Sequence, residues 1–303
     1  MMPEYDTICG ISEEELYTQL EQDIRLLAQR MNTTEVEMKA MLKKQYDGYH
    51  FSEALIDIYN PFSLITAFAN KRLASYWFST GTPTFLIELL QREGVHIPEL
   101  DGIKVKALSF DQPTEQITNV LPVLYQSGYL TIKGYDSLFD TYTLGYPNQE
   151  VRIGFLECLV PNYVHVDRMH SDFLVIDFLK DLMANNIEQC LTRMQTFFAD
   201  IPYVLENKSE KHYQTIFYIL FKLMGQYVDV EIYTDTGRID AMIALKEGIY
   251  LFEFKLDQSA AAALEQIESK EYAIKYQLDS RPLYKIGVNF SSEKRTLTEW
   301  IVK

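Results

Sequence analysis

The residues best suited to chemistry in this chain are two carboxylates and one lysine in its C-terminal third. Glu253 and Lys255 interrupt the apolar run Ile249–Leu256, and Asp240 lies in the apolar segment before it. A near-continuous apolar run of this length is typical of a strand buried on both faces. Because residues two apart on a strand share a face, Glu253 and Lys255 are expected to project together. Burying both charges is costly unless they are paired or hold a metal ion.

The hairpin between the two segments decides where Asp240 lies. Glycine adopts the positive φ of a tight turn, so the turn is expected at Glu247-Gly248. A two-residue loop there places Asp240 opposite Lys255 and diagonal to Glu253. A three-residue loop would instead place Asp240 opposite Phe254, on the other face of the sheet. The register of this hairpin therefore tests the predicted site.

Two carboxylates that converge beside a lysine can hold Mg²⁺ or Mn²⁺ through oxygen ligands, with water and a substrate phosphate completing the shell. Such an ion would polarise a phosphoryl oxygen and acidify the attacking water, while Lys255 stabilises the developing charge or orients that water. The metal ligands are then expected to be Asp240 and Glu253. The alternative is a buried Asp–Lys–Glu salt-bridge cluster without activity, because coupled charges also occur in structural networks.

The elements that position these residues are expected to form an α/β module over residues 206–303. The patterns predict helices at about 210–225 and 259–276, and strands at about 227–233, 238–245, 249–256 and 283–290. No GxxxxGK[ST] phosphate loop occurs anywhere in the sequence, so no ATP hydrolysis is expected from this chain.

The preceding residues are predicted to be mainly helical. A helix over about 12–30 opens with Ser12 and Glu15 in capping-box spacing. Further helices are expected at about 34–45, 62–70, 83–92 and 170–200. A helix at about 115–127 precedes two short strands, at about 129–132 and 141–144, which is the order of a winged-helix-like connector.

The net charge of −15 is distributed unevenly. Residues 206–303 hold 13 Lys and Arg and 15 Asp and Glu, so most of the acidity lies in residues 1–205. Neither part has the basic surface of a strong general DNA-binding protein. Weak intrinsic affinity for nucleic acid is therefore expected, and the acidic N-terminal region favours a protein partner.

The chain is expected to be a cytoplasmic protein. No apolar run approaches the ~20 residues that cross a bilayer, and the N-terminal residues lack the pattern of a secretion signal. The three cysteines, Cys9, Cys158 and Cys190, form no CxxC pair. They are interpreted as buried structural thiols in a reducing compartment.

The pattern Asp240-x12-Glu253-x-Lys255, in its order of elements, resembles the PD-(D/E)XK nuclease superfamily. The resemblance implies a restriction-endonuclease-like mixed sheet flanked by helices, with metal ligation by Asp240 and Glu253 and with Lys255 as the catalytic lysine. The family hallmark has a proline before the aspartate, whereas this chain has Ile239.

Residues on two helices are further candidates for the site. RecB-like members of the superfamily carry Gln and Tyr after the lysine, usually as QxxxY, which implies a role for Gln266 in positioning the substrate. Tyr272 lies two residues beyond the QxxxY position and is expected to pack in the core. Tyr213 and Gln214 lie on the first predicted helix of the module, where Gln214 could face the site or pack.

A second resemblance covers most of the chain. The bacterial AAA-ATPase-like family of Bacteroides type, whose C-terminal part is a PD-(D/E)XK domain, shows similar motifs. In this chain they are YDGYHF (46–51), YNPFSL (59–64), YWFSTGTP (76–83), YQSGYLTI (125–132) and YTLGYPNQEVR (142–152). The family's ATP-binding core precedes these motifs and has no counterpart here.

Together these observations predict an α/β (α+β) protein in three parts. Residues 1–105 resemble the C-terminal part of an AAA-ATPase-like domain, 106–205 form a winged-helix-like and helical connector, and 206–303 form the nuclease-like domain. The expected function is Mg²⁺-dependent hydrolysis of nucleic-acid phosphodiesters, with DNA favoured over RNA by analogy. The alternative is a catalytically silent nuclease fold that acts as a protein-interaction or regulatory module.

Overall fold

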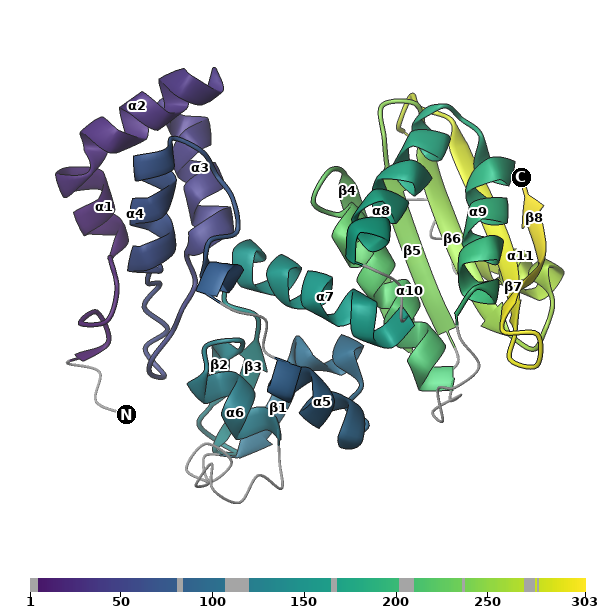
Figure 1. The fold of residues 1–303 in the computed structure, drawn as a ribbon, viewed down its shortest axis with the longest axis horizontal. Helices are drawn as coiled ribbons and strands as arrows, with labels where there is room; N and C mark the ends of the chain where they lie inside the picture. Colours follow the sequence, from purple (N-terminus) through teal and green to yellow (C-terminus); the bar gives the residue numbers. More distant parts are fainter. Residues whose placement is uncertain are drawn as a thin grey trace. The chain divides into compact units, whose positions relative to one another are not determined.

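The computed structural model describes residues 5–80, 84–106, 120–164, 168–201, 210–235, 238–269, 276 and 278–303. The chain divides into two compact units, Met1–Phe155 and Leu156–Lys303, whose elements are labelled in Figure 1. The division into three parts, with boundaries at 105/106 and 205/206, remains a prediction. The boundary between the two compact units, after Phe155, falls within the predicted connector of residues 106–205.

Four helices begin the first unit: α1 (Glu13–Gln19), α2 (Glu21–Met31), α3 (Glu35–Tyr46) and α4 (Pro61–Asn70). The predicted capping box is confirmed, since the Ser12 side chain accepts from the Glu15 N–H and the Glu15 side chain accepts from the Ser12 N–H. The single helix predicted over 12–30 was wrong, because the chain bends at Leu20 and separates α1 from α2. Apolar side chains of all four helices form one buried core.

The rest of the first unit combines short helices with a small sheet. Its elements are η2 (Trp77–Thr80), α5 (Thr84–Arg92), η3 (Ile97–Leu100), β1 (Ile103–Lys106), α6 (Val120–Gln126), β2 (Thr131–Asp136) and β3 (Thr141–Gly145). The strands pair antiparallel in the order β1-β3-β2. The predicted helix-then-two-strands order is present, and β1 was not predicted. The winged-helix assignment remains a prediction, and residues 115–119 of its first helix lie outside the described residues.

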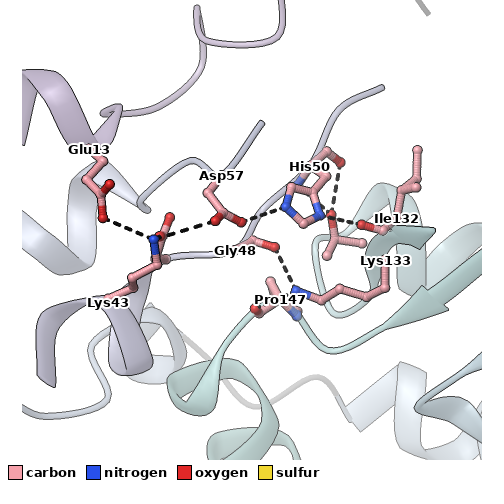
Figure 2. Close-up of polar contacts among 10 residues, drawn as sticks. Glu13, Lys43, Gly48, His50, Asp57, Ile132, Lys133 and Pro147 are labelled. Atoms are coloured by element: carbon pink, nitrogen blue, oxygen red, sulfur yellow. Dashed lines mark hydrogen bonds and ion pairs between the residues drawn. The ribbon is translucent and has the colours of Figure 1, made fainter. Parts of the chain in front are cut away.

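The YDGYHF segment docks on β2 through polar contacts, which Figure 2 shows. The His50 N–H donates to Thr131 Oγ1 over 2.9 Å, and Thr131 Oγ1 donates to the His50 carbonyl over 2.9 Å. The His50 ring lies between two acceptors, 2.5 Å from the Ile132 carbonyl and 2.7 Å from Asp57 Oδ1. Residues about 80 positions apart in the chain are therefore joined at this segment.

Lys133 of β2 anchors the same segment from its other side. Its Nζ donates to the carbonyls of Gly48 and Pro147, each over 2.9 Å (Figure 2). Desolvation by burial lowers the pKa of Lys133. Gly48 has a φ of +103°, and a Cβ there would lie 2.4 Å from the Pro147 carbonyl oxygen. Only glycine suits both the backbone and the space at this position.

Lys43 lies close to three carboxylates, and one of them, Asp57, also contacts the His50 ring. Its Nζ lies 3.0 Å from Glu13, 3.6 Å from Asp47 and 3.7 Å from Asp57. The Asp47 side chain is only 2% exposed. Burial, together with the nearby Asp57 charge, raises the pKa of Asp47 to about 6.

This raised pKa predicts that replacing Asp47 by asparagine stabilises the first unit at neutral pH. The folded state holds the Asp47 proton up to about pH 6, whereas an unfolded aspartate has a pKa of 3.8. The buried group therefore costs stability as pH rises through the window between these values, by ~3 kcal/mol at most. The stability gained in Asp47→Asn should be absent near pH 4 and complete above pH 6.

The chain has two tryptophans, whose fluorescence allows the stability of each compact unit to be measured separately. Trp77 belongs to the first unit and Trp300 to the second, so urea unfolding in a Trp300→Phe background reports the first unit alone. Glu14→Gln, which removes one exposed negative charge from α1, is the control. A difference between Asp47→Asn and the parent that does not change with pH would contradict the prediction.

The second unit is an α/β/α layer structure. Its helices are the later part of α7 (Gln149–Val164), then α8 (Arg168–Met183), α9 (Ile187–Ala199), α10 (Glu210–Met224) and α11 (Ala260–Ser269). Its strands are β4 (Asp229–Asp235), β5 (Arg238–Ala244), β6 (Ile249–Leu256), β7 (Leu283–Ser291) and β8 (Thr296–Val302). The sheet order is β4-β5-β6-β7-β8, with β6 and β7 parallel and the other pairs antiparallel. The predicted mixed sheet flanked by helices is confirmed.

Strand β6 lies between two helical layers (Figure 1), and its alternate side chains face one layer or the other. Phe252 and Phe254 pack against α10, with the Phe254 and Phe217 ring centroids 4.4 Å apart. Ile249 and Leu251 face the opposite way and pack with α11. Glu253 and Lys255 continue this second face, so α11 is the helix that lies over them.

Helix α7 and strands β1 and β8 were not predicted from the sequence. Helix α11 runs to Ser269 within the described residues, and the remainder of the helix predicted at about 259–276 falls mostly on residues 270–275, which lie outside them. Cys158 and Cys190 are buried as predicted, and burial raises the pKa of the Cys190 thiol to about 12. The prediction for Cys9 was wrong, because it is exposed. No helix in the described ranges is both long and apolar enough to cross a membrane.

Candidate functional site

The β5–β6 hairpin has a different register from the one predicted. Leu245 N–H donates to the Gly248 carbonyl over 2.9 Å, so the two loop residues are Lys246 and Glu247. Gly248 lies just before β6 and accepts this hydrogen bond, so it is not one of the two loop residues. A Cβ there would lie 2.9 Å from the Tyr284 ring, so close packing against the start of β7 explains the glycine.

This register places Asp240 opposite Glu253 and Arg238 opposite Lys255. The predicted pairing of Asp240 with Lys255 was therefore wrong by two residues. An even shift keeps Asp240 at a register position of the face that carries Glu253. The structure describes the backbone of Asp240, and its side chain lies outside the described part.

Glu253 and Lys255 form a buried ion pair. The Glu253 side chain has no exposed surface, and Lys255 Nζ lies 3.3 Å from its Oε1. The Lys255 side chain is 11% exposed, and its Nζ also donates to Gln266 Oε1. The structure thus brings together three of the four residues predicted for the site.

Gln266 reaches Lys255 because α11 lies very close to the sheet. Gly287 of β7 is the parallel partner of Glu253. A Cβ at Gly287 would lie 2.4 Å from the Ala260 carbonyl oxygen and 2.7 Å from the Leu264 nitrogen. Because Gly287 has no side chain, α11 can pack directly on β7, next to the Glu253–Lys255 ion pair.

Two polar residues near the site, Asn289 and Glu299, were not predicted from the sequence. Asn289 of β7 is the parallel partner of Lys255, and its amide contacts Gln258 N and Thr298 Oγ1. Glu299 of β8 accepts from the Ala260 N–H at the start of α11. The polar Asn289 inside the apolar run 286–290 was the available signal.

The other candidates do not join this group in the described structure. Tyr272 lies outside the described residues. Helix α10, which carries Tyr213 and Gln214, packs through Phe217 on the Phe254 side of the sheet, opposite to Glu253 and Lys255. Both Tyr213 and Gln214 are buried in that layer.

The charges at the site suit a metal ion only in combination with Asp240. Among the side chains that the structure describes, no three His, Cys, Asp or Glu residues are grouped closely enough to hold a metal ion. That set does not include the Asp240 side chain. The described part of the site is one carboxylate, one ammonium and one amide.

Comparison with known proteins identifies the C-terminal region. Residues 208–300 match the family model described as the PD-(D/E)XK nuclease superfamily. This range contains β4 to β7, most of β8, α11 and all four predicted site residues. The chain thus contains a domain of this superfamily, whose members generally use divalent metals.

A longer relative aligns along nearly the whole chain. It is the "Uncharacterized protein in vnfD 5'region" of Azotobacter chroococcum mcd 1, which is 31% identical over an alignment of 312 positions that covers 99% of this chain and 57% of the relative. The chain thus spans little more than half of that protein. No solved structure showed significant similarity. The resemblance of the N-terminal motifs to an AAA-ATPase-like family stays a prediction.

Proposed function

We propose that the PD-(D/E)XK domain at residues 208–300 is a metal-dependent nuclease, with Asp240 and Glu253 as the metal ligands and Lys255 as the catalytic lysine. The observation that carries the proposal is the buried Glu253 carboxylate, in contact with Lys255 and directly opposite Asp240 in the strand register. The family match supports a nucleic-acid substrate.

The residues fit a divalent cation in charge and in ligand type. A carboxylate with no exposed surface is costly unless a positive charge offsets it, and Lys255 supplies one such charge. A second carboxylate at the Asp240 position would leave the group with a net charge of about −1. Mg²⁺ and Mn²⁺ favour carboxylate oxygens and keep sites for water and phosphate.

The reaction is hydrolysis of one phosphodiester bond. A bound cation would polarise the phosphoryl oxygen and make water easier to deprotonate. The water oxygen forms the new P–O bond and gives up a proton, the bond to the 3′ oxygen breaks, and that oxygen is protonated to a hydroxyl, so a 5′-phosphate remains. Lys255 stabilises the negative charge that develops on the phosphoryl group. Gln266 accepts a hydrogen bond from Lys255 Nζ and thereby holds the ammonium in place.

The substrate is proposed to be DNA in preference to RNA, by analogy with the superfamily alone. Residues 206–303 carry slightly more negative than positive charge, so binding is expected to be weak and sensitive to salt. A further part of a longer protein, or a partner that contacts the acidic residues 1–205, would then deliver the substrate. The competing proposal is a silent nuclease fold, since the Glu253–Lys255 ion pair is complete without a metal.

The direct test is cleavage of end-labelled single-stranded DNA, double-stranded DNA and RNA, with and without Mn²⁺. We expect metal-dependent cleavage that leaves 5′-phosphates. Asp240→Asn, which keeps the size of the side chain and removes its charge, should lower the rate by at least ~10²-fold.

A thermal shift with Mn²⁺ separates binding from turnover. The wild-type protein should be stabilised by Mn²⁺, and Asp240→Asn should lose most of that stabilisation. Cleavage that is equal in both proteins and independent of Mn²⁺ would identify a contaminant and reject the nuclease. Absence of both cleavage and Mn²⁺ stabilisation in the wild-type protein would favour the silent fold.

A further inference from the structure

The start of α11 is tied to both strands beyond β6. Asn289 of β7 is 8% exposed, and its Oδ1 accepts from the Gln258 N–H over 2.9 Å. Its Nδ2 donates to Thr298 Oγ1 of β8 over 3.1 Å. Both ends of this buried amide are therefore used, one to fix the β6–α11 loop and one to fix the orientation of the amide.

Glu299 of β8, the strand next to β7, makes a second hydrogen bond to the start of α11. It is the antiparallel partner of Asn289, and its Oε2 accepts from the Ala260 N–H over 3.0 Å. Ser259 adds the usual cap, since its Oγ accepts from the Ala262 N–H over 3.1 Å. A carboxylate at a helix N-terminus satisfies a free N–H and interacts favourably with the helix dipole.

These ties act at one end of the helix, and the catalytic contact lies further along it. Gln266 follows Ala260 by six positions, so it lies ~9 Å along the helix axis. Because α11 has only ten residues, a displacement of the helix at Ala260 is expected to shift Gln266 as well. At Gly287 the backbone of α11 packs directly against β7, so no gap separates the helix from the sheet there.

We infer that Asn289 and Glu299 are positioning residues, which hold α11 so that Gln266 fixes the Lys255 ammonium. Neither residue needs to touch the substrate. Their catalytic consequence rests on the proposed nuclease function, whereas their effect on Lys255 does not. The two parts can therefore be tested separately.

The first arm measures Lys255 directly, without any substrate. Full-length wild type, Asn289→Ala, Glu299→Ala and Gln266→Ala are reductively methylated, and each lysine is followed by peptide mass spectrometry. Lys255 should be methylated about fivefold faster in all three variants, the change expected for a lost helix cap worth ~1 kcal/mol. The exposed Lys246 should keep its rate.

Glu299→Gln is the matched control, because its amide oxygen can still accept from Ala260 N–H. It should restore the wild-type rate at Lys255. The inference is overturned if Gln266→Ala accelerates methylation of Lys255 while Asn289→Ala and Glu299→Ala do not. It is equally overturned if all lysines accelerate together, because that result reports general loosening of the unit.

The second arm measures Mn²⁺-dependent DNA cleavage by the same proteins. Glu299→Ala should lower kcat about fivefold with KM unchanged, and Glu299→Gln should restore kcat. A change in KM alone would place Glu299 in substrate binding and reject the positioning role. If the wild-type protein cleaves nothing, the nuclease proposal fails, while the methylation arm still decides whether Asn289 and Glu299 hold Lys255.

Discussion

Replacing Lys255 by methionine is expected to lower the Mn²⁺-dependent cleavage rate by ~10²–10³-fold. The same change should destabilise the metal-free second unit by ~3 kcal/mol, because the fully buried Glu253 carboxylate loses the ammonium 3.3 Å away. Mn²⁺ replaces the lost positive charge, so it should stabilise Lys255→Met more than the wild type. Urea unfolding followed by Trp300 fluorescence in a Trp77→Phe background reports this unit.

A charge-matched double variant separates the two roles of Lys255. Lys255→Met combined with Glu253→Gln removes both charges at nearly constant volume, so it should regain most of the lost stability. It should stay inactive, because the proposed metal ligand Glu253 and the proposed catalytic lysine are both changed. If Lys255→Met unfolds like the wild type, the ion pair does not offset the burial of Glu253. If it also cleaves normally, Lys255 is not the catalytic lysine.

The second large effect is expected from the smallest substitution, Gly287→Ala. The added Cβ would meet the Ala260 carbonyl oxygen at 2.4 Å and the Leu264 nitrogen at 2.7 Å. Both are backbone atoms of α11, so no side-chain rotation can relieve the contact and the helix must move. We expect a loss of ~3 kcal/mol from the second unit, together with faster methylation of Lys255 as α11 lifts.

Gly134→Ala is the matched control, because it makes the same change inside a strand. The nearest atom to its new Cβ is Thr143 Cβ at 3.7 Å, an ordinary contact. Its stability, followed through Trp77, should change by less than ~1 kcal/mol. An equally small effect at Gly287 would show that α11 can move away from the sheet at little cost.

The two-residue repeat of a β-strand explains how much of the site was predictable from the sequence. The apolar run around Glu253 and Lys255 required a buried strand, and period-two alternation put both charges on one face. The turn was misplaced because glycine has two uses, positive φ and close packing, and Gly248 serves the second. An error of two residues in the register leaves each side chain on the same face of the sheet. Asp240 therefore keeps its place on the face of Glu253, although its partner is Glu253 instead of Lys255.

What could not be predicted depends on contacts between distant segments. Strand β8 is short, and its Glu299 looks like an ordinary surface residue until β8 pairs with β7 and brings it to the start of α11. Asn289 was visible as a polar residue in an apolar strand, but its partners Gln258 and Thr298 come from two other elements. Sequence periodicity carries no information about such pairs.

The N-terminal motifs have a structural explanation that the sequence did not reveal. Glu150, which has no exposed surface, accepts from the N–H groups of Tyr76 and Trp77, at 2.5 and 3.0 Å. The Tyr49 hydroxyl donates to the Gly128 carbonyl over 3.2 Å. The motifs around residues 46–51, 76–83, 125–132 and 142–152 are thus linked to one another within the first unit.

The parallel pairing of β6 with β7 has a consequence for the order of folding. β4, β5 and β6 join by hairpins, whose local contacts close quickly, whereas a parallel neighbour must wait for the crossover that contains α11. Lys255 therefore reaches its strand early, and Gln266 arrives only when α11 and β7 have docked. Newly made chains should pass through a stage with a formed hairpin and an unfinished site, so that the Lys255–Gln266 contact of the proposed site is completed as one of the last steps of folding.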